Sequence, residues 1–280
     1  MVTPTARHRA REARYAARRA GNSRYVEWLA RAGFTARGIM YVLVGILAVG
    51  IAFGSSAHEA DQSGALRVLA STPFGALLLW LLVGGFIGLA LWHLSEALFG
   101  GSGADGRKLS NRVTAGFKAV LYAVIAFAIM RYAIGLGAPT SSNQQTVDLT
   151  STAMREPGGR ILVGIAGVVL IGAGAYLAWR AYAKKFVDEI RTGEMSPHVR
   201  RTVVALGRVG ETARGTVFGA AGLLVLIAAV TARAHQAKGI DGTLRTFTKT
   251  PAGPWLLMLV ALGLVIFGVY SLIEARWRRL

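Results

Sequence analysis

The stretch from Arg37 to Glu96 decides the fold. It contains two apolar runs joined by a polar loop, RGIMYVLVGILAVGIAFG at 37–54 and PFGALLLWLLVGGFIGLALWHLSE at 73–96. The same pattern returns at Lys118–Arg180 and at Arg214–Glu274. A period of this kind is the signature of an architecture built from copies of one structural unit. We therefore expect three helical hairpins, each made of two apolar helices.

Charged residues and a proline hold the three copies in register. A basic residue begins each first helix: Arg37, Lys118 and Arg214. An arginine stands six positions before each of them: Arg31, Arg112 and Arg208. Each second helix begins at a proline and ends at a charged residue: Glu96, Arg180 and Glu274. Arginine in place of glutamate marks the middle copy as divergent.

The composition is typical of a membrane protein. Apolar residues make up 53% of the chain, charged residues make up 16%, and 35 of the 280 residues are glycine. Transmembrane helices combine apolarity with glycine more often than soluble helices do. The chain has no cysteine, which excludes disulfides, thiolate metal sites and cysteine nucleophiles.

The apolar stretches predict six transmembrane helices. A bilayer core about 30 Å thick needs about 20 helical residues. The expected spans are 38–54, 74–95, 119–137, 160–179, 215–232 and 254–273. The first helices of the repeats are short, so we expect Arg37, Lys118 and Arg214 to reach the membrane surface. The prediction is an all-α integral membrane protein with its three hairpins in a pseudo-threefold arrangement.

The chain divides into a basic segment and three repeat units. Residues 1–31 form the segment, and the units are 32–99, 112–182 and 198–280. Eight arginines lie in residues 1–31. We expect them to bind anionic lipid headgroups, a reading we favour over a nucleic-acid-binding arm because most of the positive charge follows the membrane topology.

Lysine and arginine counts predict the orientation. Of the 32 basic residues, 24 fall in the two terminal segments and the loops between repeats, and eight fall in the loops within repeats. Basic residues accumulate on the cytoplasmic side of a membrane. Both termini are therefore expected in the cytoplasm, with the protein in the cytoplasmic membrane.

The helix ends predict structural ion pairs. If each hairpin closes on itself, Glu96 reaches the depth of Arg37, and Glu274 reaches that of Arg214. Arg31 and Arg208 would be further donors nearby. The pairs would fix how each hairpin closes, because an unpaired carboxylate at the end of an apolar helix is costly. Alternatively, these residues form a polar ring at the cytoplasmic mouth of a pathway along the threefold axis.

The loops within repeats each carry an aspartate nine to twelve residues before the proline: Asp61, Asp148 and Asp241. We expect each aspartate to cap a short outer helix, and we favour this over a metal site because convergence of the three is not indicated. Gly-x-x-x-Gly pairs predict close helix packing. These glycines are Gly84 with Gly88 and Gly215 with Gly219.

The repeats resemble a known family. The motif Gly33-x-x-x-Arg37-Gly38 returns as Gly210-x-x-x-Arg214-Gly215, and Pro-x-Gly opens each second helix. This pattern is similar to the bacterial membrane protein family called domain of unknown function 1206. The resemblance implies six helices in three two-helix units, and it implies no activity.

Motifs for chemistry are missing from the sequence. It contains no nucleotide-binding loop, zinc-protease motif or nucleophile elbow. His93 and Glu96 share a helix face, and we favour a hydrogen-bonded structural histidine over a metal ligand or proton relay. We expect a non-catalytic module without a cofactor that binds lipid or a partner membrane protein. The alternative is a small channel or transporter.

Overall fold

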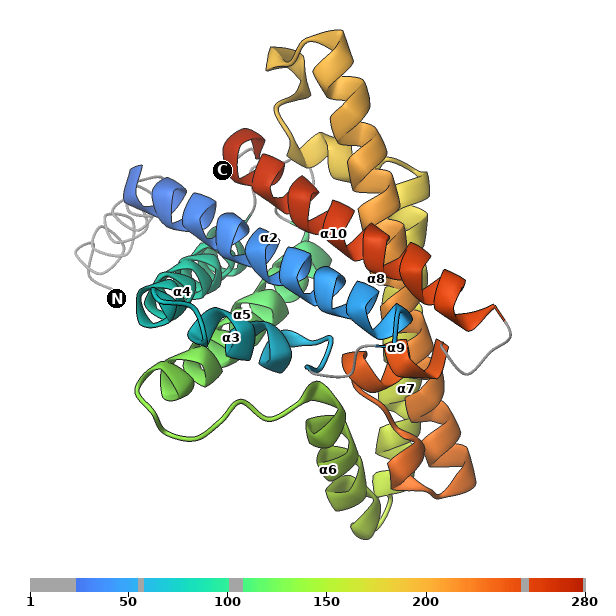
Figure 1. The fold of residues 1–280 in the computed structure, drawn as a ribbon. Helices are drawn as coiled ribbons and strands as arrows, with labels where there is room; N and C mark the ends of the chain where they lie inside the picture. Colours follow the sequence, from blue (N-terminus) through green and yellow to red (C-terminus); the bar gives the residue numbers. More distant parts are fainter. Residues whose placement is uncertain (1–23, 55–57, 101–107, 248–251, 279–280) are drawn as a thin grey trace, which may run out of the picture.

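The computed structural model describes residues 24–54, 58–100, 108–247 and 252–278. Within these ranges the regular structure is helical, with one isolated β-bridge between Ile190 and Arg278 (Figure 1). The basic segment was predicted for residues 1–31, and its residues 1–23 lie outside the described part of the chain. The all-α fold class is confirmed for the part of the chain that the structure describes.

Six helices are long and apolar enough to cross a membrane. They are α2 (Arg24–Ala52), α4 (Gly75–Phe99), α5 (Leu109–Ala133), α7 (Gly159–Tyr182), α8 (Pro197–Thr231) and α10 (Gly253–Trp277). A shorter helix joins the two long helices of each repeat: α3 (Gln62–Ala70), α6 (Ser142–Arg155) and α9 (Ile240–Phe247). Three 3-10 turns complete the connections: η1 (Lys185–Glu189), η2 (Thr192–Glu194) and η3 (Ala234–Gln236). Helix length and composition thus indicate a multi-pass membrane protein.

The first helix of each repeat begins well before the predicted span. α2, α5 and α8 run through Arg37, Lys118 and Arg214 without a break. Arg37 is buried, and the other two side chains are partly buried. The expectation that Arg37 reaches the membrane surface is therefore wrong, because its charge is compensated inside the protein, as described below.

The long helices pack in an arc, in the order α5, α4, α2, α10, α8 and α7. α2 and α10 run side by side through the middle of this arc (Figure 1). Helices of different repeats form the most extensive contacts, which are α2 with α10, α4 with α5, and α7 with α8. The hairpins of the first and third repeats also pack internally, through α2 with α4 and α8 with α10.

The hairpin of the second repeat is different, because α5 and α7 do not pack along each other. Each of them is an end of the arc. Only 28% of the most apolar stretch of α5 and 17% of that of α7 is buried, against 44–50% for the other four helices. The side of the arc between α5 and α7 is called the open side below. The pseudo-threefold arrangement stays a prediction, since the contact that would close a ring is missing.

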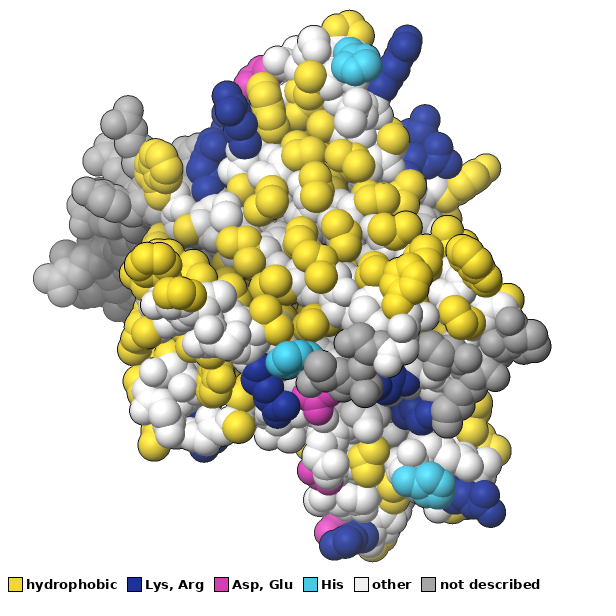
Figure 2. Space-filling view, viewed as in Figure 1, with side chains coloured by type: hydrophobic (Ala, Val, Ile, Leu, Met, Phe, Trp, Pro, Cys, Tyr) yellow, Lys and Arg dark blue, Asp and Glu magenta, His cyan; other side chains and the backbone are white. Residues whose placement is uncertain are grey.

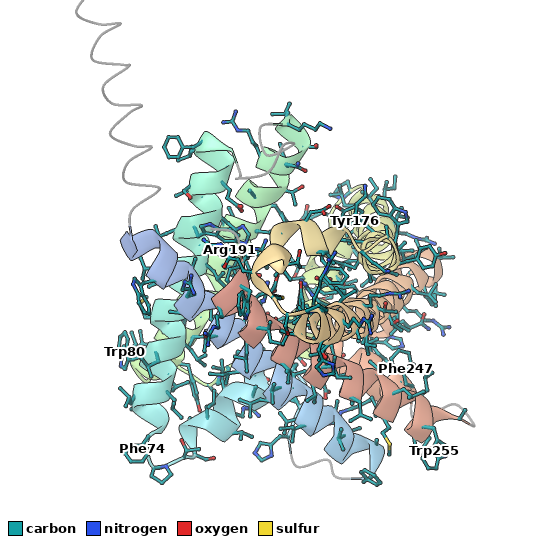
Figure 3. All side chains as sticks on the ribbon, turned by 90° about the horizontal axis from the view of Figure 1, so that it is seen from above. Phe74, Trp80, Tyr176, Arg191, Phe247 and Trp255 are labelled. Atoms are coloured by element: carbon teal, nitrogen blue, oxygen red, sulfur yellow. The ribbon has the colours of Figure 1, made fainter. Side chains whose placement is uncertain are left out.

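The hydrophobic core lies between α2, α4 and α10 and extends under α3 and α9. Its fully or almost fully buried side chains include Phe34, Leu66, Leu89, Leu244 and Leu257. The outer surface is also apolar, since hydrophobic side chains cover the middle of the face seen in Figure 2. Phe74, Trp80 and Trp255 point away from the helices (Figure 3) and are 71%, 49% and 71% exposed. An apolar surface around an apolar core is the arrangement expected of helices in lipid.

Glycines allow the close approach of several helix pairs. A Cβ on Gly88 would clash with the backbone of Leu29 in α2. A Cβ on Gly215 would lie 2.7 Å from the carbonyl oxygen of Gly174 in α7. A Cβ on Gly219 would meet open space, but its backbone N lies only 2.6 Å from a Cβ placed on Gly174, so Gly219 contributes backbone approach without itself requiring glycine. Gly84, however, faces open space, so its predicted role in packing is wrong. Gly85, one residue further round the helix, approaches Ala36 of α2 instead.

Replacement of these glycines by alanine tests the packing between α2 and α4. We expect Gly88→Ala to lower the free energy of unfolding by about 1–3 kcal/mol, because the new methyl group overpacks a rigid backbone contact. Gly84→Ala is the matched control on the same helix. It should be neutral or stabilise by up to about 1 kcal/mol through helix propensity. Thermal unfolding in detergent measures both, and equal losses would contradict the assignment.

Candidate functional site

Five charged side chains form a continuous series of ion pairs, called the charge network here: Arg37, Glu274, Arg278, Glu189 and Arg180. Glu274 accepts hydrogen bonds from Arg37 through Oε2 and from Arg278 through Oε1, the latter at 2.6 Å. Arg278 also lies 2.7 Å from Glu189, which pairs with Arg180 at 2.7 Å. The network alternates in sign from end to end, so each carboxylate lies between two arginines.

The charge network joins all three repeats. Arg37 comes from α2, Arg180 from α7 and Glu274 from α10. Glu189 lies in η1, on the loop between α7 and α8. The backbone holds this loop beside the end of α10, because the N–H of Arg191 donates to the carbonyl of Trp277 at 2.9 Å (Figure 3). Ion pairs and backbone together therefore fix the ends of three repeats to one another.

Burial and aromatic rings strengthen the network. Arg37, Glu274 and Arg278 are 8%, 3% and 9% exposed. The guanidinium carbons of Arg37 and Arg278 both lie 4.8 Å from the ring centroid of Phe34. Arg278 also lies 4.9 Å from the ring of Trp92. Cation–π contacts of this kind stabilise by about 0.5–2 kcal/mol each, most where water is excluded.

The predicted pairing within each repeat is wrong for both hairpins. Arg37 pairs with Glu274 of the third repeat, because α2 packs against α10 more extensively than against α4. Glu96 is 2.9 Å from Nδ1 of His93 on its own helix instead, which matches the expected hydrogen-bonded histidine. Arg31 donates to the carbonyl of Arg276 at 3.0 Å, and Arg208 is exposed on α8.

Arg214 has no carboxylate within ion-pair distance among the described residues. Aromatic rings surround it, since its guanidinium carbon lies 5.1 Å from the centroid of Phe267, 5.5 Å from Phe218 and 5.7 Å from Tyr41. Its Nε is buried without a hydrogen-bond partner. The cause lies in the divergent middle copy. Where α10 presents Glu274 to α2, α7 presents Arg180 toward α8.

The three aspartates of the outer loops differ in their roles. Asp61 accepts from the N–H groups of Ser63 and Gly64 at 2.9 and 3.1 Å and is the N-cap of α3. Its other oxygen accepts from the N–H of Ser142, in the loop of the second repeat, at 2.6 Å. Asp61 thus caps its own helix and links two repeats.

The capping prediction is wrong for the other two aspartates. Asp148 lies in the middle of α6, which Ser141 caps, and accepts from the Gln144 side chain at 2.7 Å. Asp241 lies within the first turn of α9 and accepts from the N–H of Ala60 at 2.8 Å. Distance from the proline was a poor guide, because the three outer helices differ in length. Among the described residues, no group of three His, Asp or Glu is arranged to hold a metal ion.

Sequence reasoning missed three members of this site. Arg278 was counted only as a C-terminal basic residue, although its spacing of four from Glu274 is that of a helical ion pair. Glu189 carried no local signal, since it shares its loop with two other acidic residues. Tyr122 of α5 is buried and interacts electrostatically with Arg37, Lys118 and Arg214. Only the packing of α5 against α4 at the end of the arc reveals it.

These features define the class of protein: a helical multi-pass membrane protein made of three two-helix units. The chain belongs to the family described as Domain of Unknown Function (DUF1206), whose model matches residues 32–100, 113–184 and 209–278. It is 30% identical over 258 residues to the uncharacterized protein YxxB of Bacillus subtilis (strain 168), covering 91% of this chain and 92% of that protein. No solved structure matches the chain significantly.

The pairing of Glu274 can be tested against that of Glu96. We expect Glu274→Gln to destabilise the protein by about 3–5 kcal/mol, because Arg37 and Arg278 would keep buried charges with too few partners. Glu96→Gln should cost only about 0.5–1.5 kcal/mol, the magnitude of one hydrogen bond. Thermal unfolding of both variants in detergent gives the comparison. A larger loss of stability for Glu96→Gln would instead support the predicted ion pair between Glu96 and Arg37.

Acid should weaken the charge network through Glu189. Burial raises the pKa of this carboxyl group, but Arg278, Arg180 and Lys118 together lower the pKa from its ordinary 4.5 to about 2. A group whose pKa is lower in the folded state stabilises that state above its unfolded pKa. The stabilisation should therefore be present above pH 4.5 and disappear as the pH falls toward 2.

Unfolding temperatures measured across this pH range test the prediction. Glu189→Gln should flatten the acid-dependent decrease, although its 37% exposed side chain makes the effect smaller than that of a fully buried group. Glu194→Gln, at an exposed position in the neighbouring turn, should retain the full decrease. Identical profiles for both variants would show that Glu189 is not responsible.

Proposed function

We propose that this protein is a non-catalytic membrane protein that binds a lipid molecule at the open side of its helix arc. The observation that carries the proposal is that α5 and α7 do not pack along each other. The other long helices that follow one another in the sequence are packed in pairs: α2 with α4, α4 with α5, α7 with α8, and α8 with α10. Helices associate in a membrane through close packing, so a side without it is filled by lipid or by another protein.

The exposed residues of the two helices that border the open side suit an amphiphile. Apolar side chains lie exposed along both edge helices, among them Val124 and Phe127 on α5 and Ile165 and Val169 on α7. The same two helices also carry basic side chains, Lys118 in the first half of α5 and Arg180 in the last turn of α7. An anionic lipid has a matching distribution, with apolar chains and a negative headgroup.

The apolar core argues against a channel. A conducting path needs polar side chains or backbone along its length. Between the charge network and the outer helices, the buried residues of α2 and α10 are mostly apolar, including Val44, Ala48, Leu257 and Val260; the polar groups of Tyr270 and Ser271 lie within one turn of Glu274, next to the network. Leu66 of α3 and Leu244 of α9 belong to the same cluster. This continuous apolar packing supports binding over conduction.

The proposed location is the cytoplasmic membrane, with both termini in the cytoplasm. The distribution of basic residues supports this, since 24 of 32 lie outside the loops within repeats. The charge network then lies toward the cytoplasmic leaflet, where anionic headgroups and exposed basic residues such as Arg208 would meet. A partner membrane protein at the open side is the competing occupant.

Native mass spectrometry of the protein, released from its own membrane with minimal delipidation, tests the proposal. We expect a complex that retains lipid in a defined ratio. A bare and homogeneous particle would contradict lipid binding, and a second protein in fixed ratio would assign the open side to a partner. In liposomes, ion and solute flux should equal that of protein-free vesicles, whereas flux above this level would support a channel.

A further inference from the structure

We propose that Arg214 and Lys118 form a phosphate-binding site inside the helix arc. The site would take a phosphate group, carried either by the headgroup of an anionic lipid or by a free phosphate ion. The lipid source rests on the function proposed above, whereas the phosphate site itself does not. The inference assigns a specific ligand chemistry to residues that the charge network leaves unpaired.

The residues of the site occupy the same position in different repeats. Arg37, Lys118 and Arg214 are the equivalent basic residues of the three first helices. Among the described residues, only Arg37 of these three has a carboxylate within ion-pair distance, namely Glu274. Lys118 and Arg214 come from α5 and α8, which lie near the two ends of the arc. The repeat therefore supplies three cations, and the divergent middle copy leaves two of them without an ion pair.

The three cations converge although they come from different repeats. Tyr122 is buried one helical turn after Lys118 on α5, and its hydroxyl lies within electrostatic reach of Arg37 and Arg214. Arg37 and Arg214 also share the ring of Phe267, whose centroid lies 5.4 and 5.1 Å from their guanidinium carbons. Three positive groups thus surround one region inside the arc. Like charges this close repel one another in a low dielectric unless an anion lies between them.

The carboxylates nearby do not supply that anion. Glu189 and Glu274 each already bind two arginines of the charge network, and Glu96 binds His93. Glu211 is buried one turn before Arg214 and attracts it from beyond ion-pair distance, and its Oε2 has no hydrogen-bond partner among the described residues. Against these four carboxylates stand five cations: Arg37, Lys118, Arg180, Arg214 and Arg278. A net positive charge is therefore left inside an apolar bundle.

The hydrogen-bonding groups of Arg214 indicate what kind of anion fits. Its Nε is buried and has no partner, as is also true of the Nε of Arg37 and Arg278, but only Arg214 of these three also lacks an ion pair among the described residues. Buried polar groups are nearly always hydrogen-bonded, so an unpaired donor points to a missing ligand. The rings of Phe218, Phe267 and Tyr41 lie around the guanidinium group, whose N–H groups lie in its own plane. Arginine binds phosphate through two such N–H groups, and lysine adds a point charge.

The open side gives a phosphate-bearing molecule a way in. Lys118 lies on α5, which is one edge of the arc, and Arg180 lies on α7, the other edge. A lipid lying between these helices would place its phosphate beside Lys118 and its chains along the exposed apolar residues. A free phosphate ion would bind the same cations without using the apolar faces. The two sources therefore differ in the lipid dependence of binding.

The test compares Arg214→Gln with Arg208→Gln. Both variants remove one positive charge from α8, but Arg208 is exposed and six residues away from the site. The full-length protein is reconstituted in phosphatidylcholine nanodiscs with and without phosphatidylglycerol, and is titrated separately with inorganic phosphate in a zwitterionic detergent. Native mass spectrometry measures retained phosphatidylglycerol, and thermal unfolding measures stabilisation by either probe.

We expect wild type and Arg208→Gln to retain phosphatidylglycerol within about twofold of each other. Arg214→Gln should bind it about tenfold or more weakly, because the substitution removes one strong charge-assisted contact. Lys118→Gln should reduce retention in the same direction. Stabilisation by inorganic phosphate, but not by phosphatidylglycerol, would assign the site to the free ion. Equal retention by wild type and Arg214→Gln, with no effect of phosphate on either, would overturn the inference.

Two further outcomes separate this site from the proposed function. Phosphatidylglycerol retained equally by all variants, without stabilisation by inorganic phosphate, would support lipid binding and refute the phosphate site. Phosphate-dependent stabilisation that Arg214→Gln abolishes, without any retained lipid, would support the site and refute the proposed function. In phosphate-free detergent, Arg214→Gln should unfold close to the wild-type temperature, because removing a buried charge without an ion pair offsets the loss of its three ring contacts and of its attraction to Glu211. A marked decrease there would show that Arg214 is structural and would count against the site.

Discussion

The series of ion pairs from Arg37 through Glu274, Arg278 and Glu189 to Arg180 is the interaction on which the rest of this protein depends. Charges inside an apolar bundle are tolerated only when each finds a partner. Here the partners come from different repeats, so satisfying the charges requires all three repeats to assemble. The same requirement explains why the first helices extend far beyond their apolar stretches: their basic residues belong inside the structure.

The divergence of the middle repeat has two structural consequences. Arg180 occupies the position that a glutamate has in the other two repeats, and it pairs with Glu189 of the following loop. Arg214 therefore has no carboxylate at ion-pair distance from this position of α7. In the same repeat α5 and α7 do not pack together, which leaves the arc open. The unpaired positive charge and the missing helix contact thus arise from one repeat. A phosphate-bearing lipid would compensate both, since it brings negative charge and apolar chains together.

At the opposite end of the helices, the outer loops are joined by carboxylate contacts to backbone N–H groups. Asp61 binds the loop of the second repeat at Ser142, and Asp241 binds that of the first at Ala60. Below these contacts, side chains such as Leu66 and Leu244 close the apolar core. The protein is therefore held together at both ends by polar contacts between repeats, while its middle is held by apolar and glycine packing.

The sequence by itself determined the three repeats, the six long helices, the outer helices and the membrane class, because helix periodicity, apolar length and composition are local properties. Tertiary structure decided that Glu274 pairs with Arg37, that Arg214 has no ion pair among the described residues, and that Gly84 faces away from the neighbouring helices. A Gly-x-x-x-Gly pattern cannot tell Gly84 from Gly85 as the contact, and charges at equal depth cannot identify their partners. Both depend on the order and rotation of helices in the arc, which follow from the packing of all the repeats together.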